Sequence, residues 1–211
     1  MSIRHINDKG QTIPPAMGEM PQGWEAYDFN VNWFLYHLPH FEKLIDWRLE
    51  IDRSIRILEV GCYEGMSTVW FLENLCKSVQ DTIVSVDWYD GLNGQSWIDI
   101  KDRAVSNIRK TGKEPQCNLM LAKSEEAMTS LTRSRFDLIY IDGDHREKAV
   151  HSDSVFAWRY LLATGGIILW DDYFCPTKVE REGVRAGLAR FCKDCNVELR
   201  FLGNAAYVIK G

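Results

Sequence analysis

The sequence predicts an α/β fold in which helices cover both sides of a doubly wound, mostly parallel sheet of seven strands. Short apolar runs alternate with helical patterns from Ile55 onward, which is typical of parallel strands joined by crossover helices. A turn containing Gly61 and Gly65 separates the first strand from its helix. Near the end of the chain, a turn at Gly203 and Asn204 predicts an antiparallel hairpin. With 211 residues, 45% of them hydrophobic, the chain can bury the core of one such domain.

Residues 1–50 precede this alternation and are predicted to form an N-terminal arm and helix. The first thirty residues are irregular, yet they carry large apolar side chains such as Trp24 and Phe29. An exposed tail rarely carries so many, so parts of the arm are expected to dock on the body of the protein or over a substrate. Residues 32–50 have a helical pattern that is broken near Pro39.

The helix of this extension is expected to cap the domain or to pair two subunits as a homodimer. Its apolar residues, together with His37, supply one buried face. His37 and His40 flank the break at Pro39, and we interpret both as interface or surface histidines rather than ligands.

Residues 51–211 are predicted to form the main domain. Its strands are short apolar runs, as expected where helices cover both faces of a sheet, and they are predicted at 56–60, 82–87, 117–121, 136–141, 167–170, 197–202 and 206–209. Helices, recognised by the spacing of apolar residues, are predicted at 67–79, 97–110, 146–162 and 180–192. Ser124 is expected to cap one further short helix, with Glu125 and Glu126 in its first turn.

Composition restricts the partners and the location of the protein. The formal net charge of −5 argues against non-specific binding to nucleic acid or to an anionic membrane. No stretch approaches the ~20 apolar residues of a membrane span. The first ten residues also lack the apolar run of a secretory signal. The six cysteines fall mostly in helix or strand patterns, and the lone Cys192-x-x-Cys195 pair is weak support for zinc. We therefore expect reduced cysteines and a cytoplasmic protein.

Polar residues follow the strands at the edge where Rossmann-like sheets bind their ligands, beyond the carboxyl ends of the strands. Glu59 and Gly61 end the first strand, and Asp87 ends the second. The later strands are followed by polar side chains that a hydrophobic core does not need, namely Ser124, Glu125, Asp142, Asp144, His145, Asp171 and Asp172. This edge is therefore the predicted functional site.

Three of these carboxylates, those of Asp142, Asp171 and Asp172, should converge because their strands are neighbours in the usual strand order. Carboxylates brought together repel one another unless they are protonated or neutralised by a cation. Hard oxygen ligands suit Mg²⁺, Mn²⁺ or Ca²⁺ better than zinc. Capping of the helix predicted at 146–162 could explain Asp142 or Asp144, but it does not explain the whole set.

The glycine turn lies within the segment ILEVGCYEGMST, residues 57–68. Gly61 and Gly65 allow the backbone to approach a ligand closely, and the start of the next helix presents unpaired N–H groups. The carboxylate of Glu59 disfavours a phosphate here and favours a ligand with a positive charge. Asp87 stands where an acidic residue commonly accepts two hydrogen bonds from ribose hydroxyls.

With these residues, the chain resembles a class I S-adenosylmethionine-dependent methyltransferase. Within that class it is most similar to metal-dependent O-methyltransferases of small molecules and sugars, the macrocin-type group and its catechol-type relatives. The segments that carry the resemblance are ILEVGCYEGMST, VSVDWYDG, FDLIYIDGDHREKAVHSD and GGIILWDDY. The related cephalosporin hydroxylase group shares part of this pattern.

The resemblance implies a role for each matching residue. Contacts with the cofactor S-adenosylmethionine are implied for Glu59, Gly61, Tyr63, Gly65 and Ser67 at its amino-acid end, for Asp87 at the ribose, and for Trp88, Ser124 and Glu125 at the adenine. Binding of Mg²⁺ or another hard divalent cation is implied for Asp142, Asp171 and Asp172. Asp144 matches the proposed general base, with His145 as the second candidate.

The expected function is therefore methyl transfer to a hydroxyl of a small molecule that is sugar-like, a vicinal diol or a catechol. Catechol-type enzymes usually have lysine where this chain has His145, and often Asp-Asn where it has Asp171-Asp172, which favours an aliphatic or sugar hydroxyl. Two alternatives are open. One is a metal-dependent glycosyltransferase that uses Asp142-Gly-Asp144, and the other is a non-catalytic ligand-binding scaffold of the same fold.

Overall fold

The computed structural model describes residues 19–89, 96–175 and 177–211, which build a seven-stranded sheet in the order β3-β2-β1-β4-β5-β7-β6. The strands are β1 (Arg56–Val60), β2 (Thr82–Asp87), β3 (Cys117–Leu121), β4 (Phe136–Ile141), β5 (Leu162–Trp170), β6 (Arg200–Leu202) and β7 (Ala205–Ile209). Strands β1 to β5 pair in parallel, whereas β7 runs antiparallel to both β5 and β6. The predicted doubly wound sheet with a C-terminal hairpin is confirmed.

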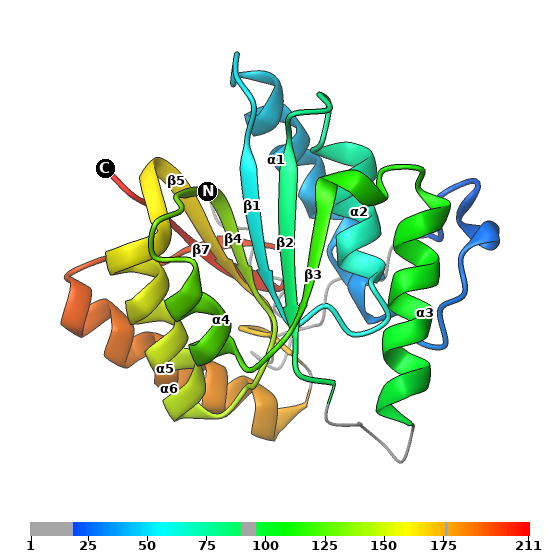
Figure 1. Ribbon diagram of the computed structural model, residues 1–211. Helices are drawn as coiled ribbons and strands as arrows, with labels where there is room; N and C mark the ends of the chain where they lie inside the picture. Colours follow the sequence, from blue (N-terminus) through cyan, green and yellow to red (C-terminus); the bar gives the residue numbers. More distant parts are fainter. Residues whose placement is uncertain (1–18, 90–95, 176) are drawn as a thin grey trace.

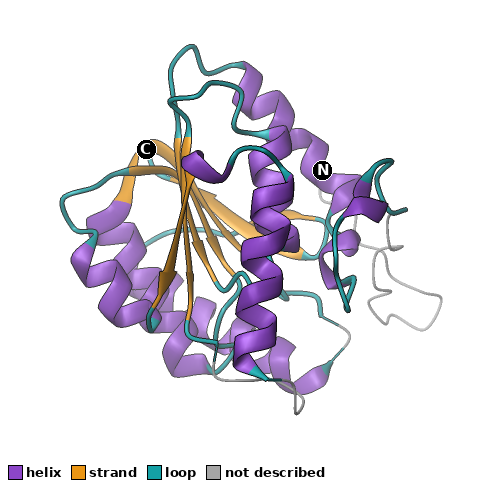
Figure 2. Ribbon diagram, turned by 45° about the vertical axis from the view of Figure 1, so that its right-hand side comes forward, coloured by secondary structure: helices purple, strands orange, loops and turns teal. Residues whose placement is uncertain are grey.

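Helices cover both faces of this sheet (Figures 1 and 2). They are α1 (Leu38–Leu49), α2 (Met66–Asn74), α3 (Trp97–Lys110), α4 (Ser124–Ser130), α5 (Glu147–Phe156) and α6 (Lys178–Cys195). Side chains of α1, α2 and α3 share one hydrophobic core with one face of the sheet, and those of α4, α5 and α6 share a second core with the other face. Ile57 and Leu58, which point to opposite faces of β1, are both fully buried, and this explains the continuous apolar runs. Within the described residues, no helix is long and apolar enough to cross a membrane.

The described part of the N-terminal extension, residues 19–50, packs into the first of these cores. Two short 3₁₀ turns, η1 (Trp24–Ala26) and η2 (Trp33–Tyr36), precede α1. Trp24, Phe34 and Phe41 are buried in the same cluster as residues of α2 and the sheet. Pro39 lies in the first turn of α1, where its missing N–H leaves no hydrogen bond unmade, so the predicted break is the start of the helix.

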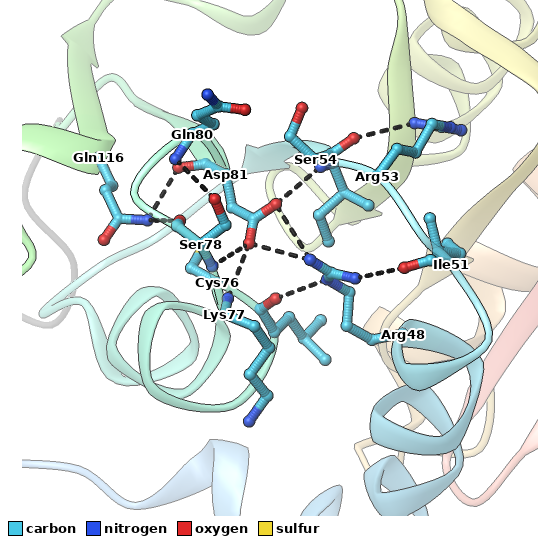
Figure 3. A network of polar contacts seen from close by, with 12 residues as sticks. Arg48, Ile51, Arg53, Ser54, Cys76, Lys77, Ser78, Gln80, Asp81 and Gln116 are labelled. Carbon is cyan, nitrogen blue, oxygen red and sulfur yellow. Dashed lines mark hydrogen bonds and ion pairs between the residues drawn. The ribbon is translucent and has the colours of Figure 1, made fainter.

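A buried network fixes the end of α1 to the amino-terminal ends of β1 and β2 (Figure 3). Asp81 accepts hydrogen bonds from the guanidinium of Arg48 at 3.0 and 3.2 Å, and from the backbone N–H groups of Ile55, Lys77 and Ser78 at 2.6–2.8 Å. Burial opposes ionisation of Asp81, but these donors outweigh it and lower its pKa. The carboxyl end of α1 is thereby fixed at the end of the sheet opposite the predicted site.

Some predicted boundaries were wrong for local reasons. Helix α2 ends at Asn74 rather than at residue 79, because Asp81 binds the N–H groups of the turn that follows it. Ser124 does not cap α4: it is the first helical residue, and its hydroxyl donates to Asp153 at 3.1 Å. Helix α5 ends at Phe156 in a π-helical turn (Ala157–Leu161), and β5 begins at Leu162, earlier than predicted. Helix α6 is longer than predicted at both ends.

Candidate active site

The glycine turn connects β1 to α2 and has an unusual backbone. Gly61, Tyr63 and Gly65 all have positive φ, at 88°, 47° and 81°. The N–H of Gly61 donates to the carbonyl of Val86 at 2.8 Å. A Cβ placed on Gly61 would lie 2.1 Å from the backbone oxygen of Asp142, so the turn lies directly against the end of β4. Glycine is needed at position 61 both for its conformation and for this close approach.

Asp87, at the end of β2, holds the turn in place. Its Oδ2 accepts the N–H groups of Cys62 and Tyr63, both at 2.9 Å, and its Oδ1 accepts the N–H of Tyr89 at 2.7 Å. Two donors occupy Oδ2, whereas Oδ1 can accept one more hydrogen bond. Oδ1 can therefore accept the predicted hydrogen bond from a ribose hydroxyl. A hydrogen bond from ribose to Oδ2 as well would require the loss of one donated by the N–H of Cys62 or Tyr63.

Glu59 lies behind the turn and is fully buried. Its carboxylate accepts hydrogen bonds from the hydroxyls of Ser67 and Thr68 on α2, both at 2.5 Å, and of Ser85 on β2 at 2.6 Å. Burial raises the pKa of Glu59 to about 7, although the three hydroxyls oppose this shift. Through these hydrogen bonds Glu59 connects β1 to α2 and β2. The contacts of Glu59 and Ser67 with a cofactor stay predictions.

The residues predicted to contact adenine lie on the other side of Asp87. The ring of Trp88 is half exposed, and the Nζ of Lys123 lies 5.2 Å from its centroid. Ser124 and the exposed Glu125 begin α4, which follows β3. Residues 90–95, which follow β2 and Trp88, lie outside the described residues.

Asp142, His145 and Asp172 form the cluster opposite the turn. The Nε2 of His145 lies 3.3 Å from Oδ1 of Asp142 and 3.5 Å from Oδ2 of Asp172, and the three side chains offer ligand atoms within 4.8 Å of one another. Burial raises the pKa of Asp142 well above its usual range and that of Asp172 to about 6. Burial opposes the charge on His145, but the neighbouring carboxylates outweigh it and raise its pKa to about 9.

Asp171 was predicted to complete a metal site with Asp142 and Asp172, but both of its carboxylate oxygens accept hydrogen bonds from other residues. Its Oδ1 accepts hydrogen bonds from Nε2 of His37 at 2.7 Å and from the N–H of Asp172 at 2.6 Å, and its Oδ2 accepts the hydroxyl of Tyr140 at 2.9 Å. Burial opposes its ionisation, but His37 and the other donors lower the pKa of Asp171 to about 2. The structure therefore gathers two of the three predicted ligands and adds His145.

His37 lies on the predicted buried face of the extension: it is only 2% exposed, so the interpretation as a surface histidine is wrong. Burial disfavours its charged form, but Asp171 outweighs this effect and raises the pKa of His37. Its spacing, three residues after Phe34 and four before Phe41, agrees with the predicted apolar face, but this spacing does not predict the contact with Asp171.

Asp144, the first candidate for the general base, also points elsewhere. Its carboxylate accepts hydrogen bonds from the backbone N–H and the guanidinium of Arg146, and Arg146 lowers its pKa. An acceptor of protons needs a free lone pair beside the reacting oxygen. Of the two candidates, His145 is the one that lies in the cluster with Asp142 and Asp172.

Two residues of the extension reach the glycine turn and carried no sequence signal. The backbone N–H and the side-chain amide of Asn30 donate to Glu64 at 2.7 and 2.9 Å. The ring of Trp33, about half exposed, lies 5.5 Å from the ring of Tyr63. The extension therefore contacts the turn as well as Asp171.

Known proteins that are similar to this chain include O-methyltransferases. A curated relative, the O-methyltransferase hkm8 of Aspergillus hancockii, is 30% identical over 121 residues, which are 57% of this chain and 44% of the relative. The match thus spans less than half the length of that relative.

Solved structures with the same fold include the O-methyltransferase of Bacillus cereus in complex with S-adenosylhomocysteine (19% identity, TM-score 0.61, 80% of each chain covered). They also include TomG of Streptomyces achromogenes in complex with S-adenosylmethionine (17%, 0.57, 80% of this chain and 79% of that one). A third is CalS11, a TDP-rhamnose 3′-O-methyltransferase (17%, 0.58, 80% and 78%). At these identities the likeness establishes the fold.

Residues 58–173, more than half of the chain, match the sequence model of the family described as "Methyltransferase domain". This region includes the glycine turn, Asp87 and the cluster opposite the turn. The protein belongs to this methyltransferase family.

Proposed function

We propose that the protein is an S-adenosylmethionine-dependent O-methyltransferase that acts on a hydroxyl of a small molecule. The observation that carries the proposal is the contact between the two halves of the site: the glycine turn packs against the backbone of Asp142, which belongs to the cluster with His145 and Asp172. The relatives named as O-methyltransferases, two of them solved with the cofactor or its product, support this activity. Membership of the methyltransferase family removes the glycosyltransferase alternative.

The methyl donor is proposed to bind along the glycine turn. The amino-acid end of the donor is proposed to lie beside the start of α2, next to Tyr63 and Gly65, while Gly61 keeps the turn against the end of β4. The free acceptor position on Oδ1 of Asp87 suits a ribose hydroxyl. Three residues are proposed to border the adenine: Trp88, which follows β2, and Ser124 and Glu125, which follow the neighbouring strand β3.

The cluster opposite the turn fits a divalent cation. The carboxylates of Asp142 and Asp172 offer ligand atoms within 4.8 Å of one another, and a cation would compensate their like charges. Mg²⁺ is the proposed metal, because hard cations prefer oxygen ligands. When bound, such an ion would make an acceptor hydroxyl easier to deprotonate and fix its direction.

Methyl transfer requires the acceptor oxygen, the methyl carbon and the sulfur to lie in line. The turn would hold the donor, and the ends of β4 and β5 would hold the acceptor. His145 is proposed to accept the proton of the hydroxyl, since Asp144 binds Arg146. The carboxylates of Asp142 and Asp172 raise the pKa of His145, and a cation bound to them would remove this effect and leave the imidazole neutral. Two adjacent oxygens on the acceptor could bind a cation held by this cluster together, which favours a vicinal diol, a sugar or a catechol as the acceptor. A homodimer and a cytoplasmic location stay predictions from the sequence.

Thermal unfolding with added S-adenosylhomocysteine tests the proposal. At a hundredfold excess over its dissociation constant, a ligand of the native state stabilises it by about 2.7 kcal/mol, which is roughly 5–10 °C for a chain of this size. No shift with saturating S-adenosylhomocysteine would contradict donor binding. A shift without methyl transfer to any diol, sugar or catechol of a broad panel would favour the non-catalytic scaffold. Full turnover after EDTA treatment would contradict the metal role.

A further inference from the structure

We propose that His37 is a positioning residue of the active site: it holds the carboxylate of Asp171 so that Asp172, its neighbour in the chain, faces Asp142 and His145. The inference rests on the proposed function, because it assumes that this cluster performs the chemistry. It assigns a role in the site to a residue outside residues 58–173, the region that matches the family.

Asp171 is held from two sides. His37 donates to Oδ1 at 2.7 Å and Tyr140 donates to Oδ2 at 2.9 Å, and the carboxylate is nearly buried. The side chain therefore has little freedom to turn toward the cluster. Of its two side-chain donors, only the histidine comes from the N-terminal extension, at the junction of η2 and α1.

The position of Asp171 determines the position of Asp172. The N–H of Asp172 donates to Oδ1 of Asp171 at 2.6 Å, the same oxygen that accepts from His37. Asp172 has φ 58°, a left-handed conformation that is strained for a non-glycine residue. The shared oxygen stabilises this turn, which directs two consecutive carboxylates to different partners: Asp171 to His37, and Asp172 to His145 at 3.5 Å.

His37 is poorly explained as a stabilising core residue. It packs against Phe41 at 4.8 Å and Phe34 at 5.6 Å between ring centroids, in a setting where an apolar side chain would fit. Its Nδ1 is buried without a hydrogen-bond partner among the described residues, which is unfavourable for folding. The benefit of histidine at this position is its single donated hydrogen bond, and that bond goes to Asp171.

Crystal structures of His37→Leu and His37→Gln test the proposal without an activity assay. Leucine removes the donor and keeps an apolar side chain, whereas the glutamine amide can still donate. We expect His37→Leu to lose the contact between His145 and Asp172 while the glycine turn is unchanged, and His37→Gln to keep that contact. The proposal is overturned if Asp172 occupies its wild-type position in His37→Leu. If that variant does not fold, Asp171→Ala is the substitute, and an unmoved Asp172 would again overturn it.

Solution measurements on the same variants separate this inference from the proposed function. We expect His37→Leu to lower turnover at least tenfold, His37→Gln to recover most of it, and both to bind S-adenosylhomocysteine within twofold of wild type. Leu44→Ala, a control in α1 whose buried side chain makes no hydrogen bond to Asp171, should lower thermal stability with turnover unchanged. Equal losses of turnover in His37→Leu and Leu44→Ala would overturn the positioning role. Failure of the wild-type protein to bind S-adenosylhomocysteine would instead contradict the proposed function.

Discussion

Gly61→Ala should disrupt the contact between the glycine turn and the end of β4. The added Cβ would lie 2.1 Å from the carbonyl oxygen of Asp142 and 2.9 Å from Cα of Gly143. Ordinary carbon–oxygen contacts are about 3.3 Å or longer, so the two backbone segments must separate by about 1 Å. The left-handed φ of 88° adds roughly 1–2 kcal/mol for any residue with a Cβ. Together we expect a loss of roughly 3–5 kcal/mol in the free energy of unfolding.

Gly112→Ala is the matched control. Gly112 also has a positive φ, 69°, but a Cβ there would meet nothing within 4 Å. It should lose only about 1–2 kcal/mol, and the difference between the variants isolates the close approach. Thermal unfolding followed by circular dichroism should show a fall of about 2–8 °C for Gly112→Ala and of about 6–20 °C for Gly61→Ala. Equal falls in the two variants would refute the contact as a determinant of this turn.

Three further predictions concern buried and clustered carboxylates. Because the pKa of Glu59 is raised to about 7, its contribution to the free energy of unfolding is largest below pH 4.5 and is lost as the pH rises toward 7. Urea unfolding of the wild-type protein should show this loss, roughly 2–3 kcal/mol, and Glu59→Gln should not show it. Asp81→Ala leaves Arg48 buried without its ion-pair partner and should lower the free energy of unfolding in urea by roughly 3–5 kcal/mol. The affinity for S-adenosylhomocysteine should be unchanged, because the pair lies at the end of the sheet opposite the site. In a turnover assay, Asp142→Asn should lower the rate at least a hundredfold and Asp144→Asn less than threefold; a larger loss in Asp144→Asn would restore that residue as the base.

The framework of the site could be predicted from sequence because it depends on patterns within short segments. The strands Arg56–Val60, Thr82–Asp87 and Phe136–Ile141 have the predicted bounds, since each is an apolar run closed by a polar residue or glycine. Their order in a doubly wound sheet then placed Asp87 and Asp142 at one edge.

The direction of individual side chains could not be predicted in this way. Asp171 and Asp172 are chemically identical neighbours, and which of them faces the cluster depends on His37, far away in the chain, and on one left-handed residue. Asp144 stands two residues from Asp142, yet it binds Arg146 on the surface. Such choices depend on long-range packing and on competition between local hydrogen bonds, neither of which has a periodic signature in the sequence.

The most direct test of the central claim is a crystal structure of the protein with S-adenosylhomocysteine. We predict that the ligand lies along the glycine turn, with its ribose at Asp87 and its sulfur directed toward the cluster of Asp142, His145 and Asp172. Ligand density at any other place, or a sulfur directed away from that cluster, would contradict the account.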